Sequence, residues 1–335
     1  MSTKYNVLGI GNAIMDVIAP VNDAVLTQEN ITKGGMTLVD ENRALALHAS
    51  FKSHSNSLSE VAGGSGANTI AGIAGLGVSA AYVGKVAEDG VGKRFTNSLR
   101  SEGVFTNTAP LKNGAATARC LIAVTPDGER SMSTYLGANT SFGVDDIDAD
   151  LIRSADITYL EGYLFDTDAQ KAAFVKASEI ATAAGRKVAL TLSDDFCVGR
   201  HRASFLHLVE NHVDILFANK DEMLSLYEID DLGEALRRVW KTGTTAAVTR
   251  SEKGSVIIDK GDIHEIAAVP VSKVVDTTGA GDQYAAGVLA GRAMNMSWQD
   301  AGRLGSICAA EVISHYGARP ETDIHTLAAS NGFKL

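Results

Sequence analysis

The chain has 335 residues, enough for one large domain with a smaller addition, and its 45% hydrophobic and 21% charged residues are ordinary for a globular protein. Its 40 acidic and 30 basic side chains give a formal net charge of -10, which argues against nucleic acid or an anionic membrane as a partner. The three cysteines lie far apart, which favours reduced, packed thiols over a disulfide framework or a metal site.

The ends and the apolar runs of the chain indicate where it works. The first residues lead directly into a predicted strand, without a basic region followed by a long apolar stretch, so we expect no secretory signal. No run approaches the roughly 20 apolar residues that span a bilayer. We therefore expect a cytoplasmic protein.

Short apolar strands alternate with helices along the chain. The predicted strands cover residues 6–9, 80–84, 157–161, 188–192, 215–218, 246–249 and 255–258. The predicted helices cover residues 68–76, 92–102, 168–184, 221–227, 232–242, 280–293 and 298–313. This order predicts an α/β fold with a mostly parallel sheet and helices on both faces.

Two stretches interrupt the alternation, at about 17–40 and 106–138. Within the second, 118–124 and 130–136 alternate like the arms of a hairpin around Pro126-Asp127-Gly128-Glu129. We expect the two stretches to pair into a small β-sheet lid over the carboxyl ends of the main strands. With only five prolines and no linker, residues 1–335 are predicted to form a single unit.

The first glycine-rich cluster runs from Ala62 to Gly77. Gly63 and Gly64 allow close approach of the backbone, and Asn68 projects an amide from the first turn of a helix of small residues. This arrangement is a candidate clamp for substrate hydroxyl groups. The alternative is a tightly packed helix whose small residues serve packing alone.

The second cluster is Val275-Asp276-Thr277-Thr278-Gly279-Ala280-Gly281-Asp282, followed by a helical run of small and apolar residues. A helix N-terminus accepts an anion through unpaired N–H groups, and glycines let that backbone come close. Asp282 is then placed to take a proton from a hydroxyl that attacks a phosphoryl group. We expect the helix terminus to lower the pKa of Asp282; the alternative is a glycine-rich turn with Asp282 as a cap.

Other nucleotide and metal motifs are absent from the sequence. A Gly-x-Gly start at Gly9 and Gly11 continues to Ile14, whose side chain would block the helix–strand contact of a dinucleotide site. No Walker loop occurs, and the histidines show no zinc-ligand spacing. Dehydrogenase, P-loop and structural zinc functions are therefore disfavoured.

The chain resembles the PfkB (ribokinase-like) family of carbohydrate and nucleoside kinases, and most closely its adenosine kinase branch. The resemblance rests on four motifs in family order. They are Gly11-Asn12-Ala13-Ile14-Met15-Asp16, Gly63-Gly64-Ser65-Gly66-Ala67-Asn68, Asn219-Lys220-Asp221-Glu222 and Asp276 to Asp282. Ser65 stands where ribokinases usually carry lysine, as is common in adenosine kinases.

The resemblance implies a ribokinase-like three-layer α/β/α domain that uses ATP and Mg2+. In this sequence it implies Asp282 as general base, with Gly279, Ala280 and Gly281 as an anion hole. It implies Asn219 and Glu222 as organisers of the metal and its water shell. The other implied contacts are Asn12, Asp16, Gly63, Gly64, Asn68, Tyr135, Leu136 and Tyr163 for the acceptor, and Thr249, Gly254, Thr277, Gly279 and Gly281 for ATP; Arg130 is a candidate to close over the phosphates.

The expected reaction is transfer of the γ-phosphoryl group of ATP to a primary hydroxyl, converting adenosine to AMP. The alternative within enzymes is a sugar kinase acting on ribose, fructose or a related ketose. A binding protein that kept the fold is the third reading, disfavoured because the base and both glycines are present. The partner is a small molecule, and the chain is expected to be a monomer or a lid-mediated homodimer.

Overall fold

The computed structural model describes residues 3–55 and 57–335, and its centre is an eight-stranded sheet. The strands are β1 (Tyr5–Ile10), β5 (Ala80–Val83), β8 (Ala155–Glu161), β9 (Lys187–Thr191), β10 (Ile215–Asn219), β11 (Thr245–Thr249), β12 (Ser255–Asp259) and β13 (Asp262–Ile266). Their order is β13-β12-β11-β10-β9-β8-β1-β5. The six strands from β11 to β5 are parallel, and β12 and β13 add an antiparallel edge.

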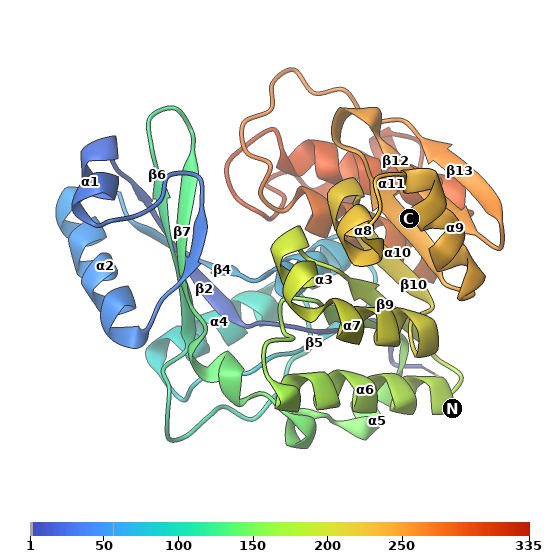
Figure 1. The fold of residues 1–335 in the computed structure, drawn as a ribbon, viewed down its shortest axis with the longest axis horizontal. Helices are drawn as coiled ribbons and strands as arrows, with labels where there is room; N and C mark the ends of the chain where they lie inside the picture. Colours follow the sequence, from blue (N-terminus) through green and yellow to red (C-terminus); the bar gives the residue numbers. More distant parts are fainter. Residues whose placement is uncertain (1–2, 56) are drawn as a thin grey trace.

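Helices cover both faces of this sheet, as the alternation along the chain predicts (Figure 1). One layer holds α5 (Ala149–Arg153), α6 (Asp168–Ala183), α7 (Asp195–Asn211), α8 (Lys220–Tyr227) and α9 (Leu232–Lys241). The other holds α3 (Ser65–Gly75), α4 (Gly90–Ser101), α10 (Ala280–Ala293), α11 (Trp298–Val312) and α12 (Ile324–Ser330). Successive residues of one strand serve the two cores: Leu216 packs in the first and Phe217 in the second.

A second, smaller sheet stands beside the main one (Figure 1). Its strands are β2 (Ile14–Pro20), β3 (Met36–Leu38), β4 (Ser59–Gly63), β6 (Ala118–Val124) and β7 (Arg130–Tyr135), in the order β3-β7-β6-β2-β4. Helices α1 (Asp23–Gln28) and α2 (Glu41–His54) pack on its outer face around Leu47 and Phe51, both fully buried. That face therefore has its own core within the chain.

The predicted strands and helices of the main sheet are confirmed within a few residues, and so is the hairpin of β6 and β7. The small sheet reaches beyond the two predicted segments, because β2 begins at Ile14 and β4 comes from a stretch not predicted to contribute. In β4 the outer positions are exposed and polar, so the sequence carries no clear strand alternation there. Three short 3-10 helices, Gly137–Ser141, Val144–Asp146 and Ser251–Lys253, complete the connections.

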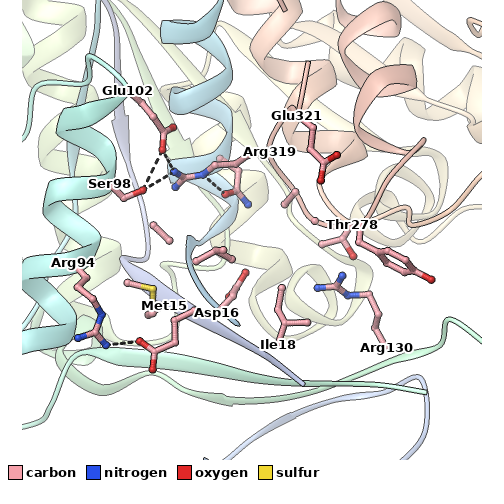
Figure 2. Close-up of a pocket in the computed structure, with 17 residues that line it drawn as sticks. Met15, Asp16, Ile18, Arg94, Ser98, Glu102, Arg130, Thr278, Arg319 and Glu321 are labelled. Carbon is pink, nitrogen blue, oxygen red and sulfur yellow. Dashed lines mark hydrogen bonds and ion pairs between the residues drawn. The ribbon is translucent and has the colours of Figure 1, made fainter. Parts of the chain in front are cut away.

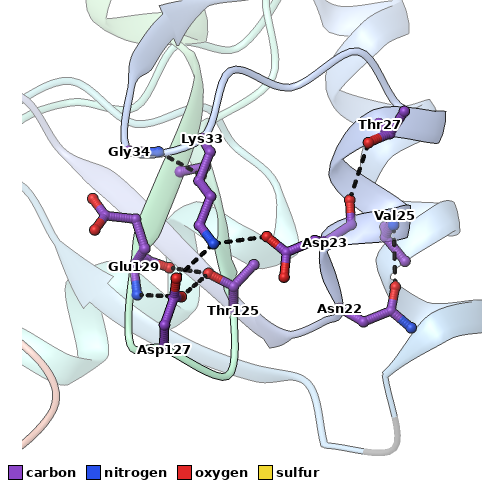
Figure 3. Close-up of polar contacts among 10 residues, drawn as sticks. Asn22, Asp23, Val25, Thr27, Lys33, Gly34, Thr125, Asp127 and Glu129 are labelled. Carbon is purple, nitrogen blue, oxygen red and sulfur yellow. Dashed lines mark hydrogen bonds and ion pairs between the residues drawn. The ribbon is translucent and has the colours of Figure 1, made fainter.

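Lys33 fastens the small sheet at its tip (Figure 3). Its ammonium group lies 2.7 Å from Asp23 at the start of α1 and 2.6 Å from Asp127 in the β6–β7 turn. The neighbouring Gly34 donates its backbone N–H to Ser131 at 3.0 Å. These contacts join the first inserted segment to the second, so that α1 and the hairpin form one body.

The structure also bears on the expected state of the cysteines and on membrane-spanning segments. Cys120, Cys197 and Cys308 are all buried and free. Within the described part of the chain, none of the helices combines the length and the apolar character that crossing a membrane requires.

Candidate active site

A cavity of about 560 Å³ lies between the small sheet and the C-terminal half of the main domain (Figure 2). Asp16 and Ile18 of β2 line one side, because they alternate with Val17 and Ala19, which face α1 and α2. The opposite side comes from Asn68 of α3, Ser98 and Glu102 of α4, and Arg319 in the segment after α11. The walls combine charged side chains, Arg94 and Arg130 among them, with apolar ones such as Met15 and Ile18.

Asp282 lies next to this cavity, in the first turn of α10, and is held by two groups of α3. The hydroxyl of Ser65 donates to its Oδ1 at 2.6 Å, and the amide of Asn68 donates to its Oδ2 at 3.2 Å. Asn68 itself lines the cavity. The two glycine clusters, more than 200 residues apart in sequence, therefore meet at one carboxylate.

The pKa of Asp282 differs from the sequence-based expectation. Burial raises it to about 6, and the hydrogen bonds from Ser65 and Asn68 and the charge of Arg319 only partly offset that rise. The expectation of a lowered pKa was wrong because it weighed the helix terminus and left out removal of the carboxyl group from water. A carboxylate with this pKa is a better proton acceptor near neutral pH than an exposed aspartate.

The N-termini of α3 and α10 differ from those of the other α-helices that the structure describes. Each of the others is capped by a side chain, whereas α3 and α10 begin with Gly64 and Gly279 and have no side-chain cap. First-turn N–H groups that lack a cap need another acceptor. For α3 that acceptor is in the protein, as described next; at α10 the terminus faces open space.

Glu161, which sequence reasoning missed, supplies the acceptor for α3. It ends β8, is 1% exposed, and accepts a backbone hydrogen bond from Asn12 at 2.6 Å and further ones from Gly66 and Ser65. Burial raises its pKa to about 8. A Cβ on Gly11 would come within 2.0 Å of its Oε2, so glycine at that position makes room for the carboxyl group.

The turn at Gly279 explains the spacing of the second cluster. Gly279 has φ of 81°, and a Cβ there would lie 2.6 Å from Cα of Ala318, so this position requires glycine. A Cβ on Gly281 would meet nothing within 4 Å. The space above the first turn of α10, bounded by the exposed Thr277, is therefore open to a ligand.

Asp16 is the second carboxylate of the cavity. Burial raises its pKa to about 7, although the charges of Arg130 and Arg319 lower it. A Cβ on Gly63 of the adjacent strand would lie 2.2 Å from Oδ2 of Asp16. Gly63 therefore provides the room in which this carboxylate stands.

The replacement Gly63→Ala is expected to displace Asp16 and to lower kcat/KM for the acceptor roughly 10–100-fold, the usual cost of a misplacement near 1 Å. The KM for ATP should change little. Steady-state kinetics with each substrate varied in turn measures both, and Gly199→Ala, where a Cβ would meet nothing within 4 Å, is the matched control. Equal effects on both substrates would show that Gly63 serves general packing.

Asn12 lies between β1 and β2, and Gly64 lies between β4 and α3, so the two residues meet where these elements come together. The carbonyl of Asn12 accepts from the Tyr82 hydroxyl at 3.0 Å, and its side-chain Nδ2 is buried without a partner. Gly64 has φ of 89°, and a Cβ there would lie 2.3 Å from the Asn12 carbonyl oxygen. Asn12 thus has one unused donor, although it does not itself line the cavity that contains Asp16 and Asn68.

Tyr135, Leu136 and Tyr163 do not line the cavity that contains Asp16 and Asn68. Tyr135 is five residues after Arg130, so the two face opposite sides of β7, and its hydroxyl reaches Glu41 of α2 at 3.3 Å. Tyr163 packs at the edge of the first core, where burial and the nearby Asp194, Asp282 and Glu222 raise its pKa. Strand parity, which an unaligned match ignores, separates Tyr135 from the cavity.

Asn219 and Glu222 form a reciprocal cap at the start of α8. The Asn219 side chain accepts from Glu222 N–H at 2.8 Å, while Glu222 accepts from the Asn219 N–H at 3.0 Å and from its amide at 2.6 Å. Burial, with a smaller contribution from the charges of Asp194 and Asp195, raises the pKa of Glu222 to about 7. Glu222 is therefore buried, with two other acidic side chains acting on it.

Thr249 lies beside Asn219, since the two are paired in register at the ends of β11 and β10. Gly254 stands further along, with φ of 75°, and a Cβ there would lie 2.0 Å from the Ile266 carbonyl oxygen. Packing of the β12–β13 edge is therefore sufficient to require glycine at 254. Thr249 and Asn219 share the edge of the sheet onto which α10 also opens.

Arg130 connects the small sheet to the second glycine cluster. Its guanidinium lies 2.5 Å from Asp276, with both side chains less than 10% exposed. Asp276 also accepts from Thr278 N–H at 3.0 Å and from Gly317 N–H at 3.0 Å. The arginine therefore stands directly before the turn that presents α10.

An open α/β sheet, a smaller sheet across its carboxyl edge, and a partly buried aspartate at an uncapped helix N-terminus are together typical of a small-molecule phosphotransferase that acts on an alcohol group. Residues 9–324 match the model of the pfkB family carbohydrate kinases, and the chain belongs to that family. Kinases of this family use ATP, so the chain is an ATP-dependent kinase with a small-molecule acceptor.

Known relatives include both nucleoside and sugar kinases. An adenosine kinase from Sinorhizobium meliloti is 45% identical with a TM-score of 0.91, over 98% of this chain and 100% of that one. A probable sugar kinase from Rhizobium etli is also 45% identical with a TM-score of 0.91, over 98% and 99%. An uncharacterized sugar kinase of Archaeoglobus fulgidus is 30% identical over 74% of this chain and 96% of its own length.

Proposed function

We propose that the protein phosphorylates the primary hydroxyl of adenosine with ATP, giving AMP and ADP. The observation that carries the proposal is that Asp16 and Asn68 line one cavity, while Asn68 holds Asp282 next to it and the charge of Asp282 acts on Asp16. One carboxylate is available to bind vicinal hydroxyls and the other to accept a proton. The 45% identity to an adenosine kinase over nearly the whole chain supports a nucleoside as acceptor.

In the proposed reaction Asp282 takes the proton of the attacking hydroxyl while the γ-phosphoryl group passes in line from ATP to that oxygen. The backbone N–H groups of Gly279, Ala280, Gly281 and Asp282 stabilise the developing negative charge. Asn219, Thr249 and Thr277 border the space assigned to the triphosphate, and Gly254 keeps the adjoining strands close.

Asn12, Asp16, Gly63, Gly64 and Asn68 are assigned to the acceptor. Asp16 accepts hydrogen bonds from two hydroxyls, and Asn12 offers its unpartnered Nδ2. Gly63 and Gly64 serve by leaving room, as their Cβ distances indicate. The cavity volume is in the range of sites for nucleoside-sized ligands and is generous for a free pentose.

Mg2+ is the proposed metal, and Glu222 with Asn219 would hold it through water. Their fit is indirect: among the described residues, no group of three or more His, Cys, Asp or Glu side chains is arranged to hold a metal ion. A water-mediated site needs no such group, and a nearby cation would favour the ionised form of Glu222, whose pKa is raised mainly by burial and to a smaller extent by Asp194 and Asp195. Bound there, the ion would neutralise phosphate charge.

The replacement Glu222→Gln is expected to raise the Mg2+ concentration for half-maximal activity roughly 10-fold, because an outer-shell carboxylate is lost. Glutamine still completes the cap with Asn219, so the fold should persist. Activity measured over a Mg2+ titration tests this, with Glu228→Gln at the other end of α8 as the control. An unchanged requirement would remove Glu222 from the metal site.

A sugar kinase acting on ribose, fructose or a related ketose is the second candidate, because relatives named as sugar kinases match the chain well. One assay separates the two. ADP release is measured with adenosine and with a panel of free sugars, and the product is identified as AMP or a sugar phosphate. A kcat/KM for any free sugar above that for adenosine would reject the proposed acceptor, and binding of adenosine without turnover would reject the enzyme.

A further inference from the structure

Arg319 is a charged cavity residue that neither the sequence motifs nor the proposed mechanism uses. It lies in the segment that follows α11, and its guanidinium reaches three side chains (Figure 2). Its Nε donates to Asn68 Oδ1 at 3.1 Å, and its Nη1 donates to Glu102 at 2.5 Å and to Ser98 at 3.3 Å. These contacts link the segment after α11 with α3 and α4.

The contact with Asn68 decides how that amide is oriented. An arginine can only donate hydrogen bonds, so the atom of Asn68 that faces Arg319 must be the carbonyl oxygen. The amide NH2 then points away from Arg319 and donates to Asp282 Oδ2 at 3.2 Å. Within the described part of the chain, Arg319 is the donor that holds the carbonyl side of this amide.

The backbone around Arg319 is tied to the same turn. Gln283, the residue after Asp282, donates its amide to the carbonyl oxygens of Asn68 at 3.1 Å and Ala318 at 3.0 Å. Ala318 also lies against Gly279, whose Cβ position would fall 2.6 Å from its Cα. Arg319 is thus held in register with the N-terminus of α10, and Ser98 and Glu102 hold its outer end.

We propose that Arg319 is a positioning residue for phosphoryl transfer: it fixes the Asn68 amide, and through it the carboxylate of Asp282, in the orientation that receives the hydroxyl proton. The proposal rests on the assignment of Asp282 as the base. The charge of Arg319 adds to the geometric effect, because it favours the ionised forms of Asp282 and Asp16.

Two carboxyl groups and three hydroxyl groups also act on Asp282 or are acted on by it. Asp16 of β2 and Glu161 of β8 are carboxyl groups whose pKa values Asp282 raises. Tyr159 and Tyr163 have pKa values raised by burial and then by nearby carboxylates, so they stay neutral. Ser65 supplies the second hydrogen bond. Arg319 is the cation among the groups that act on the Asp282 pKa.

The test compares Arg319→Met, Arg319→Lys and Arg94→Met by the pH dependence of kcat. Met removes the hydrogen bond and the charge, so we expect kcat to fall about 10–100-fold. The apparent pKa on the acidic limb of the kcat–pH profile should rise by roughly half to one pH unit. Lys returns the charge and should bring that apparent pKa most of the way back. Arg94 lines the same cavity and pairs with Glu60, so its loss should leave the limb in place.

A double-mutant cycle with Asn68→Ala separates action through Asn68 from a direct effect. In the Ala background, Arg319→Met should lower kcat by no more than about twofold, because the amide that it orients is gone. Thermal unfolding checks that each variant is folded, and Arg319→Leu, which also lacks a donor for Asn68, replaces Met if that variant does not fold. Full additivity in the cycle would reject the proposal.

A measurement without turnover keeps this proposal separate from the proposed function. The 13C signal of the Asp282 carboxyl carbon, assigned by its loss in Asp282→Asn, is titrated in the free protein. An upward shift of its pKa in Arg319→Met supports the positioning role even if a sugar proves to be the acceptor. An unshifted pKa together with an unchanged kcat and a raised acceptor KM would overturn it and leave Arg319 as a substrate contact.

Discussion

The replacement Asp282→Asn is expected to lower kcat roughly 10²–10⁴-fold, the usual worth of a positioned general base. Asparagine keeps the size of the side chain and can still bond Ser65 and Asn68, so the turn and α10 should be undisturbed. The KM values should change much less than kcat. The wild-type rate should rise with pH through an apparent pKa near 6, since the base must be ionised, and the variant should lose that limb.

The control for this experiment is Asp168→Asn, at the first turn of α6, where the side chain is fully exposed. It removes the same charge from an equivalent place in a helix, and we expect wild-type kinetics. Measurements of kcat from pH 5 to 9 on the wild type, Asp282→Asn and Asp168→Asn test whether Asp282 is the general base. An Asp282→Asn enzyme with near wild-type turnover would remove the general-base assignment.

The second large effect concerns Asp16. A carboxylate built to accept two vicinal hydroxyls rejects an acceptor that lacks one, because a buried oxygen is then left unpaired. We expect the enzyme to prefer adenosine over 2'-deoxyadenosine by roughly 10²-fold or more in kcat/KM. Asp16→Asn should lose most of that preference while it raises the KM for adenosine.

The raised pKa of Asp16 gives this prediction a pH signature. Hydroxyl donors favour the ionised carboxylate, so binding of the acceptor should lower the pKa of Asp16 from about 7. The KM for adenosine should therefore fall as pH rises through 7. Asp23→Asn, on the far side of the small sheet, serves as the control. Equal discrimination by wild type and Asp16→Asn would move the hydroxyl-binding role elsewhere.

The contribution of these carboxyl groups to the free energy of unfolding should fall as pH rises, whereas kcat should rise. Asp16, Asp282 and Glu161 all have folded-state pKa values above their unfolded ones, so the folded form binds protons more readily. The stability that protonation of these groups contributes is fully present at low pH and is lost as pH rises through about 6 to 8. The free protein therefore holds these carboxylates for function at a cost in stability near neutral pH.

What the sequence predicted well is local. The alternation of strands and helices needs only neighbouring residues. Gly63, Gly64 and Gly279 indicate positions where other groups come close to the backbone, and the structure has such close contacts at all three. Asp282 and Asn68 were each readable from their own motif. Their meeting could be inferred only from the resemblance, because nothing within either cluster points to the other.

What the sequence did not predict depends on distant partners. Glu161 ends an ordinary buried strand, and its role comes from backbone groups about 95 and 150 residues earlier. Arg319 acts through Asn68, 251 positions away. The resemblance placed Tyr135 among the acceptor contacts, yet the two-residue period of β7 turns its side chain toward α2. The Asp282 pKa depended on burial, which has no local signature.

The small sheet bears on how the chain could assemble. Its outer face, the one through which two such sheets could pack, is covered by α1 and α2 around Phe51. Its inner face borders the cavity through Asp16 and Ile18. Met36 and Leu38 of β3 and Val61 of β4 are exposed apolar residues of this sheet, and a homodimer formed through the small sheet stays a prediction.

The role of Asp282 as the proton acceptor is tested most directly by a crystal structure with adenosine and an unreactive ATP analogue. We expect the primary hydroxyl oxygen to lie within about 2.6–3.2 Å of an Asp282 carboxylate oxygen, with the two ribose hydroxyls at Asp16. A primary hydroxyl directed away from Asp282, with that carboxylate bonded only to Ser65 and Asn68, would contradict it.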